Sequence, residues 1–218
     1  MKKIKKQMLT KGEEIANSIT HGVGAALSIT ALTLLIVTSF KNGDAKDVAG
    51  AMIFGISMLI LYLMSTFCHA FAKKGGTVRK VFHILDHSAI YILIAGTYTP
   101  FCLTMIGGTK GLTILFVQWS LAFIGIFFRS VFYNRFVPVH VAIYLAMGWM
   151  VAFFIPTIYP LVSSTGLLLL AIGGAFYTIG VLFYAIRMFK FHHMVWHLCV
   201  IGGTACHFFM IYLYVLPR

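Results

Sequence analysis

The sequence has few acidic residues, with five Asp and Glu among 218 residues against 17 Lys and Arg. Charged residues make up 10% of the chain and hydrophobic residues 60%, and the mean hydropathy is +0.93. So few charges could not solvate a water-soluble protein of this size. The composition therefore predicts an all-α integral membrane protein and excludes an ordinary soluble domain.

Cysteine is also scarce, and none of the four residues forms a C-x-x-C pair. All four lie in or beside apolar runs, where Cys usually behaves as a small hydrophobic residue. Cys68 adjoins His69, so a contact with a metal is a further option for it. The basic N-terminus has no small-residue cleavage site close behind it, so we expect a retained first helix and not a removed signal peptide.

Seven apolar runs follow one another, each near the ~20 residues that cross a hydrocarbon core of ~30 Å. They predict a seven-transmembrane helix bundle, a single domain over 1–218 with a short basic lead-in over 1–21. Tight turns join the first run to the second and the third to the fourth, whereas Pro138, Pro156 and Pro160 bracket the fifth run and could shift its ends. The predicted spans are 22–40, 48–70, 82–106, 111–128, 137–156, 164–186 and 194–216.

The basic residues favour one orientation of this bundle. With the N-terminus in the cytoplasm, thirteen Lys and Arg fall in cytoplasmic segments and four in outer segments. Cytoplasmic loops of membrane proteins carry such an excess. We therefore predict a cytoplasmic N-terminus, a C-terminus outside, and membrane lipids as partners of the basic turns. The net charge of +12 forms no extended basic face, which argues against nucleic acid as a partner.

The polar residues of the apolar runs gather at the predicted cytoplasmic end. His69 closes the second run, His193 and His197 open the seventh, and Asp86 lies about one turn into the third. The i, i+4 spacing of His193 and His197 places two imidazoles on one helix face, which suits a tetrahedral metal, although head-group contacts explain that pair alone at least as well. A third His and a carboxylate at the same depth favour a metal site, because ionisable groups in spans cost roughly 2.5–3.5 kcal/mol each.

Other polar residues lie near this cluster. Ser65 precedes His69 by four residues, so its hydroxyl points toward the same side, unless it bonds back to its own helix. His83 and His87 flank Asp86 and could be metal ligands or partners of the carboxylate.

Glu14, Asn17 and His21 precede or open the first run, and on a helix they fall within one narrow sector. Two interpretations stay open for this sector. It is either the solvated polar side of a lead-in helix or an inward-facing polar group near the histidines.

Four segments carry a resemblance to a known family, in the expected order and spans. They are EEIANSITHGVGA, SMLILYLMSTFCHAF, FHILDHSAIYILIAGTYTPF and HHMVWHLCVIGGTACHFF. Along essentially its whole length the chain resembles the hemolysin III branch of the adiponectin and progestin receptor family, a group of seven-span proteins. That branch implies a multi-pass protein of a bacterial plasma membrane.

The resemblance implies a zinc ion near the cytoplasmic side, held by His69, His193 and His197. It also implies that Asp86 is the carboxylate that meets the zinc-bound water and that Ser65 is its neighbouring serine. The wider superfamily is similar to integral-membrane hydrolases that cleave amide bonds in lipids such as ceramides. The chain lacks the long N-terminal domain of the receptor branch, so no peptide hormone is expected as a partner.

Three functions compete on these grounds. The first is a zinc-dependent hydrolase of lipid amides or esters, with Asp86 as general base and Ser65 bonded to the water or to the developing oxyanion. The second is a non-enzymatic sensor or regulator of lipid state with structural zinc. The third is a lytic protein that makes membranes leak.

Overall fold

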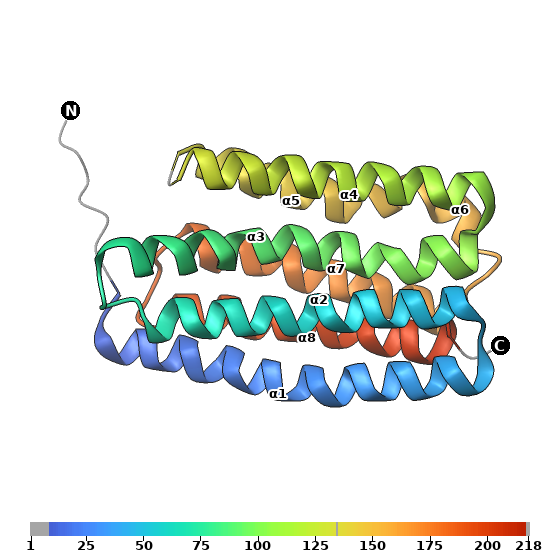
Figure 1. The fold of residues 1–218 in the computed structure, drawn as a ribbon, viewed down its shortest axis with the longest axis horizontal. Helices are drawn as coiled ribbons and strands as arrows, with labels where there is room; N and C mark the ends of the chain where they lie inside the picture. The colour runs from blue at the N-terminus through green and yellow to red at the C-terminus, as the bar shows by residue number, and fades with distance from the viewer. Residues whose placement is uncertain (1–8, 134, 217–218) are drawn as a thin grey trace.

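The computed structural model describes residues 9–133 and 135–216, and this part of the chain is helical throughout, apart from its turns. Figure 1 shows the helices running side by side along one axis. The α-helices are α1 (Lys11–Asn42), α2 (Ala45–Ala70), α3 (Gly76–Pro100), α4 (Gly108–Val131), α5 (Val137–Trp149), α6 (Ile155–Ile158), α7 (Ser164–Ala185) and α8 (His192–Tyr214). A π-helical turn, η1 (Phe101–Ile106), continues α3, and a 3₁₀ segment, η2 (Met150–Phe154), joins α5 to α6.

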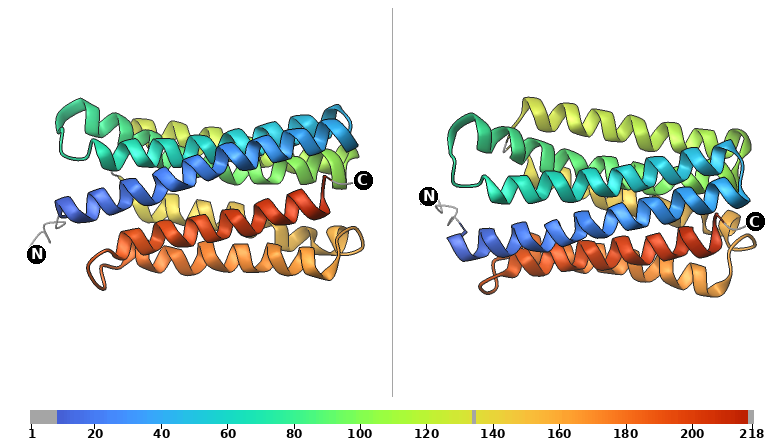
Figure 2. Two further views of the ribbon diagram at one scale, coloured as in Figure 1. Left: turned by 90° about the horizontal axis from the view of Figure 1, so that it is seen from below. Right: turned by 60° about the horizontal axis from the view of Figure 1, so that its bottom comes forward.

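Seven helical segments of the described chain are long and apolar enough to cross a membrane, as the sequence predicts. They form a ring in which each helix contacts the next in sequence, and α1 closes the ring by packing against both α2 and α8. Figures 1 and 2 show α1 to α4 in one layer and α5, α7 and α8 in the other. Because the number of spans is odd, the start of α1 and the end of α8 lie at opposite ends of the bundle.

The first span is longer than its apolar run. We predicted 22–40, whereas α1 begins at Lys11. Its start is set by a capping box, in which Thr10 and Glu13 satisfy each other's backbone N–H groups. The added turns do not form a solvated lead-in, because Asn17 and His21 are buried within the bundle. The structure thus places the side chains of Asn17 and His21 facing the inside of the bundle.

The fifth span is broken, not merely shifted at its ends. Its α-helix stops at Trp149 and passes through η2 into α6, whose first turn contains Pro156. Proline lacks an N–H group and clashes with the carbonyl four residues earlier, which prevents a continuous helix. Tyr98 satisfies the freed groups, because its hydroxyl accepts the Val151 N–H at 2.8 Å and points its hydrogen at nearby α5 carbonyls.

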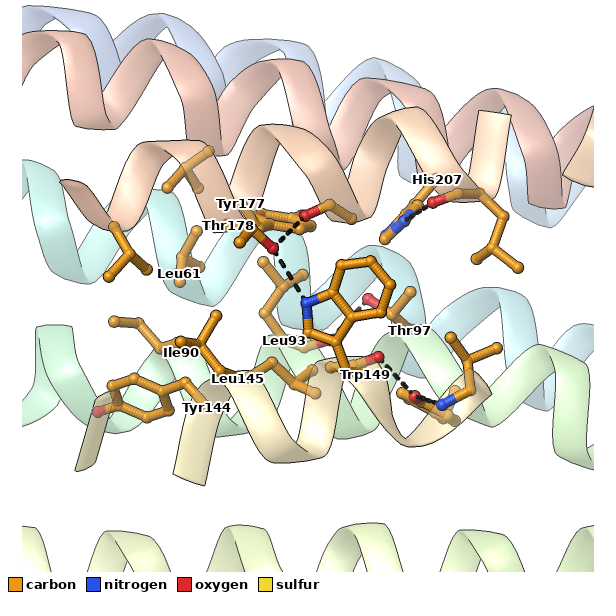
Figure 3. A pocket seen from close by; sticks show the side chains of 18 of the residues that line it. Leu61, Ile90, Leu93, Thr97, Tyr144, Leu145, Trp149, Tyr177, Thr178 and His207 are labelled. Atoms are coloured by element: carbon orange, nitrogen blue, oxygen red, sulfur yellow. Dashed lines mark hydrogen bonds between the residues drawn. The ribbon is translucent and has the colours of Figure 1, made fainter. Parts of the chain in front are cut away.

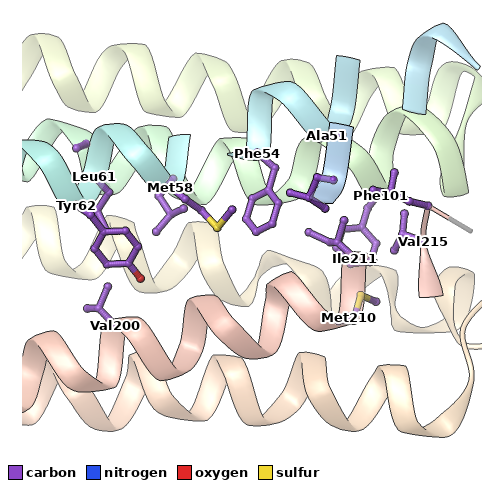
Figure 4. Packing of buried hydrophobic residues seen from close by; sticks show 14 of the residues in the cluster. Ala51, Phe54, Met58, Leu61, Tyr62, Phe101, Val200, Met210, Ile211 and Val215 are labelled. Atoms are coloured by element: carbon purple, nitrogen blue, oxygen red, sulfur yellow. The ribbon is translucent and has the colours of Figure 1, made fainter. Parts of the chain in front are cut away.

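The core lies mainly between α2, α3 and α8, where large apolar side chains interlock (Figure 4). Small residues bring helices close together, as is usual in membranes. At Gly111, for example, an added Cβ would collide with the Cys102 carbonyl oxygen, so α4 packs directly on η1. The outward side chains are also apolar, as with Phe153 and Phe116, which are 83% and 74% exposed. Such a surface suits lipid and not water.

Candidate metal centre

Three histidines meet at the end of the bundle where α2 stops and α8 starts. The nitrogen ligand atoms of His69, His193 and His197 all lie within 4.8 Å of one another. Their ring centroids are 4.8 to 5.2 Å apart in each pairing. The structure therefore brings together the three residues that the sequence analysis selected, and this group could hold a metal ion.

The chemistry of the donors fits such an ion. The Nε2 atom of His69 is buried and has no hydrogen-bond partner among the described residues. A buried polar atom without a partner is rare, and a metal ion would satisfy it. Three imidazole ligands leave a fourth tetrahedral position open, which is the pattern of catalytic rather than structural zinc sites.

Helix α1 accepts hydrogen bonds from two of the three imidazoles, on the side of each ring opposite to Nε2. His69 donates from Nδ1 to the Glu14 carboxylate at 2.7 Å, and His197 donates from Nδ1 to the Asn17 carbonyl at 3.2 Å. With Nδ1 occupied in this way, Nε2 of each ring is left as the ligand atom. Such bonds fix the tautomer and orientation of a metal-binding histidine.

His21 also belongs to this neighbourhood but lies beside the triad. Its ring stacks on that of His197, with centroids 3.6 Å apart and planes 9° apart, and it meets Tyr62 edge-on. Thus α1 contributes Glu14, Asn17 and His21 as a layer behind the ligands.

Asp86 of α3 faces the same space from the opposite side. The Ser65 and Cys68 side chains lie near enough to interact with its carboxylate, so the Ser65 side chain faces the site and Cys68 neighbours Asp86 and is not part of the ligand group. His87 approaches Asp86 as well, with 3.6 Å between Nδ1 and a carboxylate oxygen, while its Nε2 lies 3.1 Å from the Tyr184 hydroxyl. His87 therefore accompanies the carboxylate and not the three-histidine group.

A cavity of about 380 Å³ opens from this cluster into the interior of the bundle. Ser65, Asp86, His193 and His197 line its polar end, and the remaining wall is almost entirely apolar. Figure 3 shows its middle, where Trp149 of α5 reaches across to α7 and donates from Nε1 to the Thr178 hydroxyl at 3.0 Å. The cavity joins the histidine cluster to a long apolar chamber.

Arg129 is not the solvated loop cation that the count of basic residues assumed. We counted it among the cytoplasmic loop cations, yet it lies in the last turn of α4 and is fully buried. Its Nη2 atom donates to His83 Nδ1 at 2.9 Å. The count of basic residues in loops is wrong for Arg129, because it treats every cation beyond an apolar run as solvated. The bonds of His83 and His87 place both residues on the α3–α4–α7 side of the site.

Two features beside the site were not recognised from the sequence. One is the Cys68 contact with Asp86, for which spacing gives no signal. The other is Glu13, which is 1% exposed and bonded to the start of α8. The T-x-x-E pattern of Thr10 and Glu13 is a helix-start signature, and it could have shown that α1 begins before the apolar run.

Comparison with known proteins decides the family. The profile described as "Haemolysin-III related" matches residues 9–208. The chain belongs to this family. Among haemolysin-III-related proteins, "Hemolysin-3 homolog" of Bacillus subtilis is 46% identical over 207 residues, which cover 95% of this chain and 96% of that protein. "Hemolysin-3" of Bacillus cereus is 46% identical over 205 residues, covering 94% of this chain and 93% of the relative.

A more distant relative is the human "Monocyte to macrophage differentiation factor", 28% identical over 207 residues, which cover 93% of this chain and 84% of the human protein. These matches confirm the resemblance found in the sequence. Together with the seven apolar helices, they identify a haemolysin-III-related, multi-pass protein of the cell membrane. The orientation of its termini stays a prediction.

Proposed function

We propose that this protein is a zinc-dependent hydrolase that cleaves amide or ester bonds of membrane lipids from within the bilayer. One observation carries the proposal: His193 and His197 of the three-histidine group line a cavity together with the buried carboxylate of Asp86, and most of the remaining cavity wall is apolar. A purely structural ion would not need the open position, the carboxylate or the chamber.

His69, His193 and His197 would hold the ion. When bound there, zinc supplies Lewis-acid polarisation of a carbonyl group and makes a water molecule more acidic. Glu14 and Asn17 keep the His69 and His197 rings turned toward the ion.

Asp86 would act as the general base, because among the described residues it is the only carboxylate that lines the cavity. Its carboxylate takes the proton of the attacking water, and it can later return that proton to the departing amine or alcohol. The polar side chains of Ser65 and Cys68 beside the carboxylate would help to orient it. In this arrangement Ser65 acts through Asp86, in addition to the contact with water or oxyanion that the sequence suggested.

The apolar chamber would bind an acyl chain and exclude water from it. The volume of the whole cavity, about 380 Å³, lies within the range of small-molecule sites, roughly 300–1,000 Å³. A lipid whose chain fills the chamber would present its carbonyl at the polar end. The same fit explains why the site lies inside the bundle and not at its surface.

The experiment uses purified wild-type protein in detergent or nanodiscs, loaded with zinc, and a panel of ceramide-like amides and lipid esters. Released fatty acid is measured by mass spectrometry. We expect turnover by the wild type and a loss of at least about 10²-fold in Asp86→Asn, with zinc content unchanged, because general-base catalysis contributes about 10²–10⁴-fold. The control is Asp47→Asn, which alters a buried carboxylate near the start of α2, at the opposite end of the bundle. Zinc-loaded wild type without turnover across the panel would contradict the proposal.

A regulator with structural zinc is the second candidate, because the ligands of the ion would join α2 to α8. The two candidates differ in the importance of Asp86. A cellular effect that survives Asp86→Asn but not His193→Ala favours the regulator, whereas loss in both variants favours the hydrolase.

A lytic activity is the third candidate, favoured only by the name Hemolysin-3 of the two Bacillus relatives. Dye release from liposomes measures it directly. Release that persists in the variant with both His69→Ala and His193→Ala would favour lysis over a metal-dependent function.

The positive-inside pattern supports a cytoplasmic location for the site. Reporter fusions after Tyr214 test this orientation, which requires the C-terminal reporter to lie outside.

A further inference from the structure

Glu13 is a buried carboxylate whose two oxygens serve different helices. Its Oε2 atom accepts hydrogen bonds from the Thr10 N–H and hydroxyl, each at 2.8 Å, and so caps α1. Its Oε1 atom accepts the backbone N–H of Phe191 at 3.3 Å. The Arg187 guanidinium approaches Oε2 at 3.5 Å. One side chain thus ties the first turn of α1 to the segment that leads into α8.

The Phe191 position controls how α8 begins. Phe191 is the N-cap residue of α8 and has φ of 64°, a left-handed conformation that is uncommon for a bulky residue. Such a conformation persists only where the surroundings hold it. The Phe191 side chain makes no capping hydrogen bond, so this turn is held by the bond from its backbone N–H to Glu13 and by the bond of His192 Nδ1 to the Phe183 carbonyl at 2.6 Å. His193 follows two residues later.

The neighbouring acidic residue, Glu14, bonds to the other helix that carries a histidine of the site. Glu14 bonds to His69 at the end of α2, whereas Glu13 bonds to the start of α8. Successive residues on a helix point about 100° apart. One turn of α1 therefore reaches both helices that carry the histidines, and Figure 2 shows α1 beginning beside the α7–α8 connection.

We infer that Glu13 is a positioning residue for the metal centre, which sets the register of α8, and with it His193 and His197, relative to His69. This inference rests on the proposed metal site but not on hydrolysis. Glu13 touches neither the ligands nor the cavity, so its influence passes through the start of α8, to which it bonds directly, and through the first turn of α1, which carries Glu14.

The alternative is that Glu13 only caps its helix, and Asp47 provides a matched comparison. Asp47 is also a buried acid at the third position of a capping box, where it accepts the Asp44 N–H at 3.0 Å. It lies at the opposite end of the bundle from the histidines. A general loss of stability from a weakened capping box should therefore appear in both variants, whereas a change at the metal centre should appear at Glu13 alone.

The test variant is Glu13→Gln, since Gln is also accepted in capping boxes. Its amide oxygen can keep the bond to Thr10, but its NH₂ group then faces the Phe191 N–H, and two donors cannot bond. The control is Asp47→Asn. For each protein, zinc affinity is measured by competition with a chromophoric chelator, the visible spectrum of the Co²⁺-substituted protein reports ligand geometry, and the melting temperature of the metal-free protein reports folding.

We expect Glu13→Gln to weaken zinc binding about tenfold or more, in the range typical of residues that orient ligands, and to alter the Co²⁺ spectrum. Asp47→Asn should leave both unchanged, at a similar melting temperature. If Glu13→Gln does not fold, Glu13→Asp takes its place, because its shorter carboxylate keeps the charge but cannot span both contacts. It too should weaken zinc binding.

The outcomes separate the two proposals. Wild-type zinc affinity in a folded Glu13 variant overturns the positioning role and leaves the metal site intact. An equal loss of affinity in Asp47→Asn also overturns it, because the effect would then be one of capping. Wild-type protein that binds no zinc overturns the metal site and this role together.

Discussion

The two halves of α1 differ in whether their polar side chains bond to other helices. In the first half, Glu13, Glu14 and Ser18 bond to α2 or to the start of α8. In the second half, the buried hydroxyls of Ser28 and Ser39 bond back to carbonyls of their own helix at 2.8 Å.

The two kinds of bond have different structural consequences. A hydroxyl bonded to its own helix satisfies itself wherever that helix lies. A side chain bonded to another helix fixes the relative position of the two. The cross-helix bonds of α1 are gathered where the histidines meet, which indicates that the geometry of this end is under the tightest constraint.

The largest effect should come from removing a metal ligand at the end of the bundle where the cross-helix bonds of α1 gather. We expect His193→Ala to reduce bound zinc to near zero, because two imidazoles rarely retain the ion against competition. Zinc content of the purified protein, measured by inductively coupled plasma mass spectrometry, checks this. His207→Ala is the control, since His207 lies deeper on α8 and bonds to Leu170. Equal zinc loss in the control would point to general damage.

A smaller effect should follow from removing a cross-helix bond that orients a ligand. We expect Glu14→Gln to weaken zinc affinity about 10- to 100-fold, because the carboxylate orients His69 and strengthens it as a ligand. Chelator competition measures the change. Ser18→Ala removes another cross-helix bond of α1, to the Thr66 carbonyl, without touching a ligand. If both variants lose affinity equally, cross-helix bonding as such and not ligand orientation is responsible.

The smallest effect is expected in the second half of α1. Ser39→Ala removes a hydroxyl that bonds only to the Leu35 carbonyl, so the free energy of unfolding should change by about 0.5 kcal/mol or less. Zinc affinity should stay the same. Reversible denaturation in mixed micelles gives the first quantity and chelator competition the second. A change above about 1 kcal/mol would show that the comparison between the halves is too simple.

The sequence predicts the spans well because bilayer thickness sets their length. The sixth predicted span, 164–186, agrees with α7 at Ser164–Ala185. The meeting of His69 with His193 also follows from the alternation of spans across the membrane. Both results need only the order and length of the apolar runs.

Other features depend on how each helix is rotated about its own axis, which side-chain packing determines and apolar runs do not. The bond of Glu14 to His69 and the contact of Cys68 with Asp86 are of this kind. The burial of Arg129 was missed for another reason, since counting loop charges assumes that every loop residue meets water. The break after Trp149 required knowing that Tyr98 could satisfy the freed backbone.

The closure of the ring between α1 and α8 also imposes an order on assembly. Ribosomes make the chain from the N-terminus, so α1 and α2 exist long before α8 does. A nascent chain that has not reached α8 lacks both His193 and His197 and holds His69 as its only member of the triad. The metal centre therefore cannot be completed before His197 has been made, and a product that ends before α8 cannot form it.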